Sequence, residues 1–136
     1  DSGTDCDDSD ATISPVATEI YGDGIDQDCD GIDPAVTTDW ADVESILSSN
    51  NCLGCHGSSG GLTITYDNIV SVANGLTGLS YIEPYAPEDS YLWHKINGTQ
   101  SSVGGSGSNM ANKGGVNLSA TDFSLIEEWI AGGALP

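Results

Sequence analysis

Apolar positions follow a helical period in two stretches, one beginning near residue 39 and one ending near the C-terminus. In residues 39–50 the apolar side chains recur three and four positions apart, and Asp39 stands where a helix N-cap is expected. In the second stretch, Ser119 and Asp122 have the spacing of a capping box, and an apolar face continues to Gly132. The pattern therefore predicts two amphipathic helices.

Two shorter helices are predicted between them. Residues 66–72 favour a short helix, although 62–66 alternate as a strand would. A further helix is expected to start at Asp89 or Ser90 and to stop at Gly98.

A long loop of Gly, Ser and Asn separates this helix from the last one. It covers residues 97–117 and contains Met110, the only methionine. So long a stretch without regular structure in a compact domain is usually functional or disordered. The residues around Met110 show neither a helical nor a strand-like apolar pattern. Met110 is therefore less easily explained as a residue of the hydrophobic core.

The N-terminal residues 1–36 have no helical period and are rich in Asp, Gly and Ser. The first 33 residues hold 11 of the 21 acidic residues, while the chain has only two basic ones and a formal charge of −19. Such a charge repels nucleic acid and anionic lipid, so cations or cationic partners are implied. The sequence therefore predicts an acidic module, 1–36, and a second domain, 37–136.

The sequence contains no apolar run long enough to span a membrane. It opens on a polar run without a signal-peptide pattern, so we expect that a targeting segment has been removed.

Four cysteines form two pairs of different spacing. Cys52 and Cys55 precede His56 in a C-x-x-C-H motif, which places two thiols for the vinyl groups of one porphyrin edge and an imidazole for the iron. A redox pair or half of a zinc site is the alternative, and zinc would need two more soft ligands, for which Cys6 and Cys29 are candidates. The helices on either side and the lone methionine favour covalent haem c.

The sixth iron ligand is predicted to be Met110, with His94 as the alternative. Haem iron in cytochromes is held by His with Met or with a second His. His94 lies on an expected helix, where an ordinary histidine is the commoner outcome.

Residues 39–136 resemble class I cytochromes c, especially small secreted bacterial ones. The resemblance rests on the C-x-x-C-H-G motif, the segment Ser90-Tyr-Leu-Trp-His-Lys95, a methionine and a final helix; Ala111 departs from the Pro that often follows the ligand methionine. It implies an all-α cytochrome c fold around one haem, bound by His56 and Met110. The first and last helices, which hold Trp40 and Trp129, would then cross near the haem edge.

The acidic module contains the segment Asp26-Gln-Asp-Cys-Asp30-Gly31, which matches the opening of an EF-hand loop. A conventional EF-hand is excluded because Thr37 stands where its bidentate Glu belongs. Calcium takes six to eight oxygens, whereas copper prefers His, Met or thiolate, and the module has no His or Met. The predicted calcium ligands are Asp5, Asp7, Asp8, Asp10, Glu19, Asp26, Asp28 and Asp30.

Cys6 and Cys29 lie among these carboxylates without a histidine nearby, which favours a disulfide formed in an oxidising compartment. The bridge would bring both acidic clusters together. Residues 5–33 resemble an Asp- and Cys-rich metal-binding motif of secreted bacterial proteins, with Val16 in place of its usual Gly. A solvated acidic tail without metal is the alternative.

Together these features predict an electron carrier rather than an enzyme, in the periplasm or at the cell surface of a bacterium. A basic redox protein is one expected partner, and other copies of the chain, joined through calcium, are a second. One alternative is a haem enzyme or ligand sensor with an open or His94-ligated iron; a peroxidase would want a distal Arg, and the chain has none. Another is a calcium-held surface module in which haem is structural.

Overall fold

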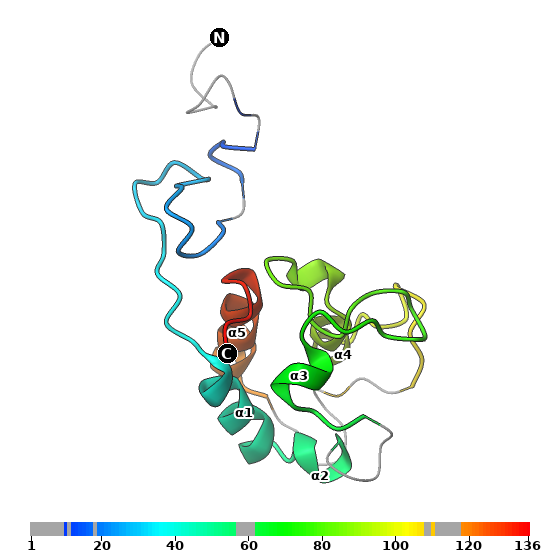
Figure 1. The fold of residues 1–136 in the computed structure, drawn as a ribbon. Coiled ribbons are helices and arrows are strands. Elements are labelled where there is room, and N and C mark those ends of the chain that lie inside the picture. Colours follow the sequence, from blue (N-terminus) through cyan, green and yellow to red (C-terminus); the bar gives the residue numbers. More distant parts are fainter. Residues whose placement is uncertain (1–9, 11, 18, 57–61, 108–109, 111–117) are drawn as a thin grey trace.

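The structure is a computed structural model, and it describes the chain except for residues 1–9, 11, 18, 57–61, 108–109 and 111–117. Its elements in chain order are α1 (Trp40–Ser49), α2 (Cys52–His56), α3 (Tyr66–Ile69), the 3-10 helix η1 (Pro87–Asp89), α4 (Tyr91–Asn97) and α5 (Ala120–Ala131) (Figure 1). Extended pairing in the described ranges is limited to isolated bridges. None of the described helices is long and apolar enough to cross a membrane.

Helix α1 starts where the sequence predicted it. The Asp39 carboxylate accepts a hydrogen bond from the Asp42 N–H, and the Asp42 carboxylate accepts one from the Asp39 N–H, which completes a capping box. Val43, Ile46 and Leu47 are buried on the inner face. The predicted cap and the predicted apolar face are both confirmed.

Helix α5 packs against α1 and forms the centre of the core. Its N-terminus carries the predicted Ser119–Asp122 capping box. Trp129 is fully buried, and its ring lies 5.6 Å from that of Trp40 at an interplanar angle of 45°. The Trp129 indole N–H donates to the Leu135 carbonyl, so the C-terminal residues also fold onto this core.

Helix α4 begins one residue after Ser90 and ends at Gly98, which adopts a left-handed conformation with φ of 77°. The prediction left the start open between Asp89 and Ser90. The structure decides this because Asp89 belongs to η1, and the buried Ser90 hydroxyl accepts a hydrogen bond from the Glu83 N–H.

Helix α3 is shorter than predicted, since it ends at Ile69 rather than near residue 72. Val70 pairs with Ile82, and the Ile82 N–H donates to the Ile69 carbonyl at 2.9 Å. Tertiary pairing therefore draws these residues out of the helix. The strand alternative for 62–66 does not form, because 62–65 carry no regular structure and Tyr66 starts α3.

The described part of the acidic module has neither helix nor strand and is joined to the helices by a stretch that runs beside α5 (Figure 1). The Thr37 N–H and hydroxyl and the Thr38 hydroxyl all approach one oxygen of Glu128, at 3.2, 3.0 and 3.3 Å. The side chain of Val36 lies over Gly132. The connection between the two parts is thus anchored on the last helix.

Candidate functional site

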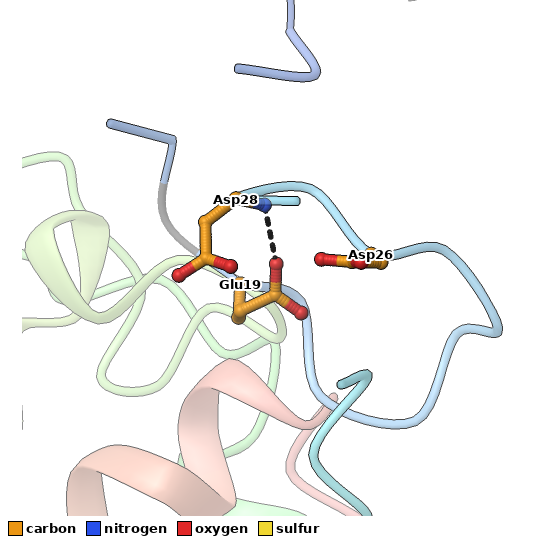
Figure 2. Close-up of side chains that lie close together, drawn as sticks. All are labelled: Glu19, Asp26 and Asp28. Atoms are coloured by element: carbon orange, nitrogen blue, oxygen red, sulfur yellow. Dashed lines mark hydrogen bonds between the residues drawn. The ribbon is translucent and has the colours of Figure 1, made fainter. Parts of the chain in front are cut away.

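Three carboxylates of the acidic module lie together. Glu19, Asp26 and Asp28 each offer an oxygen within 4.8 Å of the others, and all three side chains are half-buried (Figure 2). Their negative charges repel one another, and a bound cation would offset that repulsion. Hard oxygen donors at this spacing are typical ligands of calcium or magnesium.

Hydrogen bonds within the loop fix two of these carboxylates. Asp26 accepts from the N–H groups of Asp30 and Gly31, at 3.1 and 2.8 Å, and Asp28 accepts from the Asp30 N–H at 3.1 Å. The bond from Asp28 to the N–H two residues on is an Asx turn, in which a side chain takes the place of a backbone carbonyl, whereas the Asp26 carboxylate spans the loop to N–H groups four and five residues on. Gly31 has φ of 94°, the left-handed conformation that glycine adopts without strain.

Glu19 comes from outside this loop and approaches it from below in the view of Figure 2. One of its carboxylate oxygens accepts from the Asp28 N–H at 2.7 Å, while Oε2 is buried and has no hydrogen-bond partner. A buried carboxylate oxygen without a partner is unfavourable unless another group binds it. An EF-hand loop ends on a Glu that binds calcium, and this chain has Thr37 at that position. Glu19 therefore adds a carboxylate to the loop from an earlier part of the chain.

The other predicted metal ligands are distributed differently. Asp10 is exposed and accepts hydrogen bonds from Thr12, which lower the pKa of its carboxyl, the side-chain bond contributing most. Asp30 accepts from the Ile32 N–H at 2.8 Å and is not part of the three-carboxylate group. The remaining three, Asp5, Asp7 and Asp8, lie outside the described residues.

The described cysteines differ in their state. Cys52 and Cys55 are free thiols, whereas Cys29 is disulfide-bonded. Its predicted partner, Cys6, lies outside the described residues, so the pairing of Cys6 with Cys29 stays a prediction.

Sequence reasoning missed two residues that shape the acidic module. The buried Gln27 accepts from the Ile20 N–H and donates to the Asp23 carboxylate, and so holds the chain next to Glu19. Asp33 accepts from the N–H groups of Gly22 and Gly24, both at 2.7 Å. The sequence signal for Asp33 was the Gly22-Asp23-Gly24 segment. The backbone N–H groups of such a tight turn need a hydrogen-bond acceptor nearby, and Asp33 supplies it.

The C-x-x-C-H motif forms the short helix α2, which contacts α1. Asn51 joins the two helices in a left-handed conformation with φ of 57°. A Cβ at Gly54 would lie 2.7 Å from the Asn51 side-chain oxygen, so a side chain at this position would displace the end of Asn51. Cys52 and Cys55 are three residues apart on a helix and therefore share a face.

The thiols and the imidazole of α2 differ in their surroundings. Burial raises the pKa of the Cys52 thiol, and the neighbouring Cys55 adds to the rise. A redox-active C-x-x-C pair needs a thiol with a lowered pKa, so this environment does not suit thiol-disulfide exchange. His56 Nδ1 is buried without a hydrogen-bond partner, which leaves the ring incompletely satisfied within the protein.

The two candidates for the sixth iron ligand also differ. His94 is buried; its Nε2 lies 2.8 Å from the Glu88 carbonyl oxygen and its Nδ1 lies 2.7 Å from the Thr99 hydroxyl. Both ring nitrogens are thus engaged within the protein. Met110 is half-buried, and its backbone N–H donates to the Lys95 carbonyl at 3.0 Å.

Comparison with known proteins bears on the acidic module alone. The family model Cu-binding MopE, described as "Putative metal-binding motif", matches residues 5–34, the stretch that holds the three clustered carboxylates. Residues 5–34 resemble a metal-binding motif. The motif is one of secreted bacterial proteins, and together with the carboxylate group it indicates a bound metal ion. No cytochrome c family model matches, and no curated protein or solved structure matches the chain.

Proposed function

We propose that this protein is a secreted monohaem c-type cytochrome that transfers electrons, and that its acidic module binds calcium. The observation that carries the haem assignment is the helical C-x-x-C-H motif, with two free thiols on one face and an adjacent imidazole whose buried Nδ1 has no partner. The motif follows α1 after two residues, and the Gly54 N–H donates to the Asn51 carbonyl at 3.3 Å, which ties α2 to the end of α1.

The residues of α2 fit a covalent haem better than they fit zinc or a dithiol. Haem bound there would supply an iron that cycles between two oxidation states. Cys52 and Cys55 would fix the porphyrin edge, and His56 would bind the iron. A zinc site would need two further soft ligands, and Cys29 is already disulfide-bonded.

Met110 is the sixth ligand in this proposal. His94 would have to give up at least one buried hydrogen bond before a ring nitrogen could bind iron, and a buried partner left without its bond is costly. A thioether ligand raises the reduction potential relative to a second imidazole. If His56 and Met110 both bound the iron, no position on it would remain for a substrate, which favours electron transfer over an enzyme or a ligand sensor.

Calcium is the metal that best fits the acidic module. The family name mentions copper, but the clustered donors are carboxylates, and residues 1–36 contain neither His nor Met. Copper favours imidazole and sulfur ligands, whereas calcium favours several carboxylate and carbonyl oxygens. The buried Glu19 oxygen that lacks a partner is then a calcium ligand.

The haem assignment is tested by the covalent bond. Protein secreted from a bacterium with haem c maturation should keep its haem in acidified organic solvent, and a Cys52→Ser, Cys55→Ser double variant should lose it. A Ser49→Ala variant, changed at the last residue of α1 just before this motif, serves as the control and should keep the haem. Protein that carries no haem, or haem that the solvent removes from the unaltered chain, would overturn the assignment.

The proposed partners follow from charge and from the calcium module. A chain with formal charge −19 favours a basic redox protein. A second partner is another copy of the chain, with calcium joining neighbours so that haems approach in series. Light scattering tests this directly: chelation should reduce the particle size, and an unchanged size would remove the assembly from the proposal.

A further inference from the structure

One residue of α4 holds the loop that contains Met110 at two points. The Lys95 carbonyl accepts the Met110 backbone N–H at 3.0 Å, and the Lys95 ammonium donates to the Ser106 carbonyl at 2.8 Å. One contact fixes the methionine itself, and the other fixes the chain four residues before it. Both therefore set the position of Met110 relative to α4.

The described residues just before Met110 are held together within the loop, and one of them passes close to α4. The buried Gln100 donates from its side-chain amide to the Gly107 carbonyl at 3.1 Å, and its backbone carbonyl accepts the Gly105 N–H at 2.8 Å. A Cβ at Gly105 would lie within 2.8 Å of the Tyr91 hydroxyl oxygen, so the loop passes too close to α4 for a side chain. Lys95 thus acts on a segment, residues 100–107, that is ordered by its own contacts and lies beside Tyr91 of α4.

We propose that Lys95 is a positioning residue that keeps Met110 available as the sixth iron ligand. This inference rests on the proposed function, because it assumes His56 and Met110 on one haem. Ordering a flexible loop costs conformational entropy, and a loop that is ordered in advance spares the thioether bond that cost. Without the Lys95 ammonium, Met110 would occupy the competent position for a smaller fraction of the time.

The expected consequences appear at the iron. A less occupied Met110 weakens the far-red methionine-to-iron absorption band and lowers the reduction potential. An added ligand such as imidazole then competes more easily for the iron. Its apparent affinity increases because the Met110-bound state, which excludes it, is less populated. Imidazole should therefore bind the ferric Lys95→Leu protein about tenfold more tightly than the unaltered protein.

The test compares ferric holoproteins by visible absorption and imidazole titration. Lys95→Leu keeps an apolar stem but removes the ammonium, and Lys95→Arg keeps charge and donors. Ser102→Ala is the matched control, since it removes a 2.7 Å hydrogen bond to Thr99 inside the same loop that does not reach the helix. We expect a weakened band in Lys95→Leu, a restored band in Lys95→Arg and an unchanged band in Ser102→Ala.

The possible outcomes separate this inference from the proposed function. If the unaltered holoprotein lacks the methionine band, the ligand assignment fails. If it has the band and Lys95→Leu keeps the same band and imidazole affinity, the positioning role is overturned. Should Lys95→Leu fail to fold, Lys95→Ala, which also removes the ammonium that donates to the Ser106 carbonyl, is measured instead; a weakened band supports the positioning role, and an unchanged band overturns it.

Discussion

Val36 packs on Gly132, so the chain leaving the acidic module lies directly against the C-terminal end of α5. A Cβ built on Gly132 would stand 2.9 Å from Val36 Cγ1 and closer still to Cγ2. Gly132 has φ of −81°, so its backbone does not require glycine. The absence of a side chain there is explained by the approach of Val36, which couples the two parts of the molecule.

Replacing Gly132 with alanine should therefore destabilise the protein by about 1–3 kcal/mol, the usual cost of an overpacked contact. The β-branched Val36 has little rotamer freedom with which to move away. Chemical denaturation followed by tryptophan fluorescence measures the change. Gly75→Ala is the control, because nothing lies within 4 Å of a Cβ at that position.

A second substitution checks the cause. Val36→Ala in the Gly132→Ala background should recover most of the lost free energy of unfolding, because it removes the clashing methyl groups. Additive losses in the double variant would show that the two residues do not interact.

Glu19→Gln should weaken calcium binding by about tenfold or more, since affinity at such sites depends on the number of charged ligands. The amide keeps the size of the side chain and retains one acceptor for the Asp28 N–H. Isothermal titration calorimetry gives the affinity. Glu44→Gln removes the same charge from an exposed position of α1 and should leave the affinity unchanged; equal losses in both variants would mean that only net charge matters.

Calcium should also protect the acidic module from proteolysis. Cleavage within residues 10–36 requires local opening, and a ligand at 100 times its dissociation constant stabilises the closed form by about 2.7 kcal/mol, or roughly a hundredfold in cleavage rate. Limited proteolysis with and without a chelator measures this. Cleavage that is equally fast in both conditions would contradict a calcium-stabilised module.

In haem-free protein, Cys55 should react with iodoacetamide several times faster than Cys52. The thiolate is the reactive form, and burial raises the pKa of Cys52, so Cys52 is less ionised at a given pH. Because the shift is upward, the rate for Cys52 should continue to increase above the ordinary pKa range of a thiol. Peptide mass spectrometry gives both rates; a Cys52 rate that levels off below that range would contradict the buried environment.

The helices were predictable because their determinants are local. Asp39 with Asp42, and Ser119 with Asp122, form capping boxes within four residues, and Gly98 ends α4 at the predicted place. Helix α3 was predicted too long because its limit depends on Ile82, far along the sequence.

The metal site was predictable in kind but not in geometry. The Asp26, Asp28 and Asp30 repeat identifies a cation-binding loop, yet the structure groups Glu19 with the first two and leaves Asp30 bonded to the backbone. The hydrogen bonds of Gln27 and Asp33 hold the turns of this module, and these turns decide which carboxylates lie close together. Those contacts span several residues and have no short motif.

The central claim is that the chain carries one electron on a six-coordinate haem, and spectroelectrochemistry tests it most directly. The holoprotein should titrate as a single one-electron couple, with low-spin spectra in both oxidation states and no carbon monoxide adduct. Met110→Ala should lose the far-red band, shift the couple to lower potential and bind carbon monoxide. A high-spin unaltered protein that binds carbon monoxide, or one with no haem couple, would contradict the account.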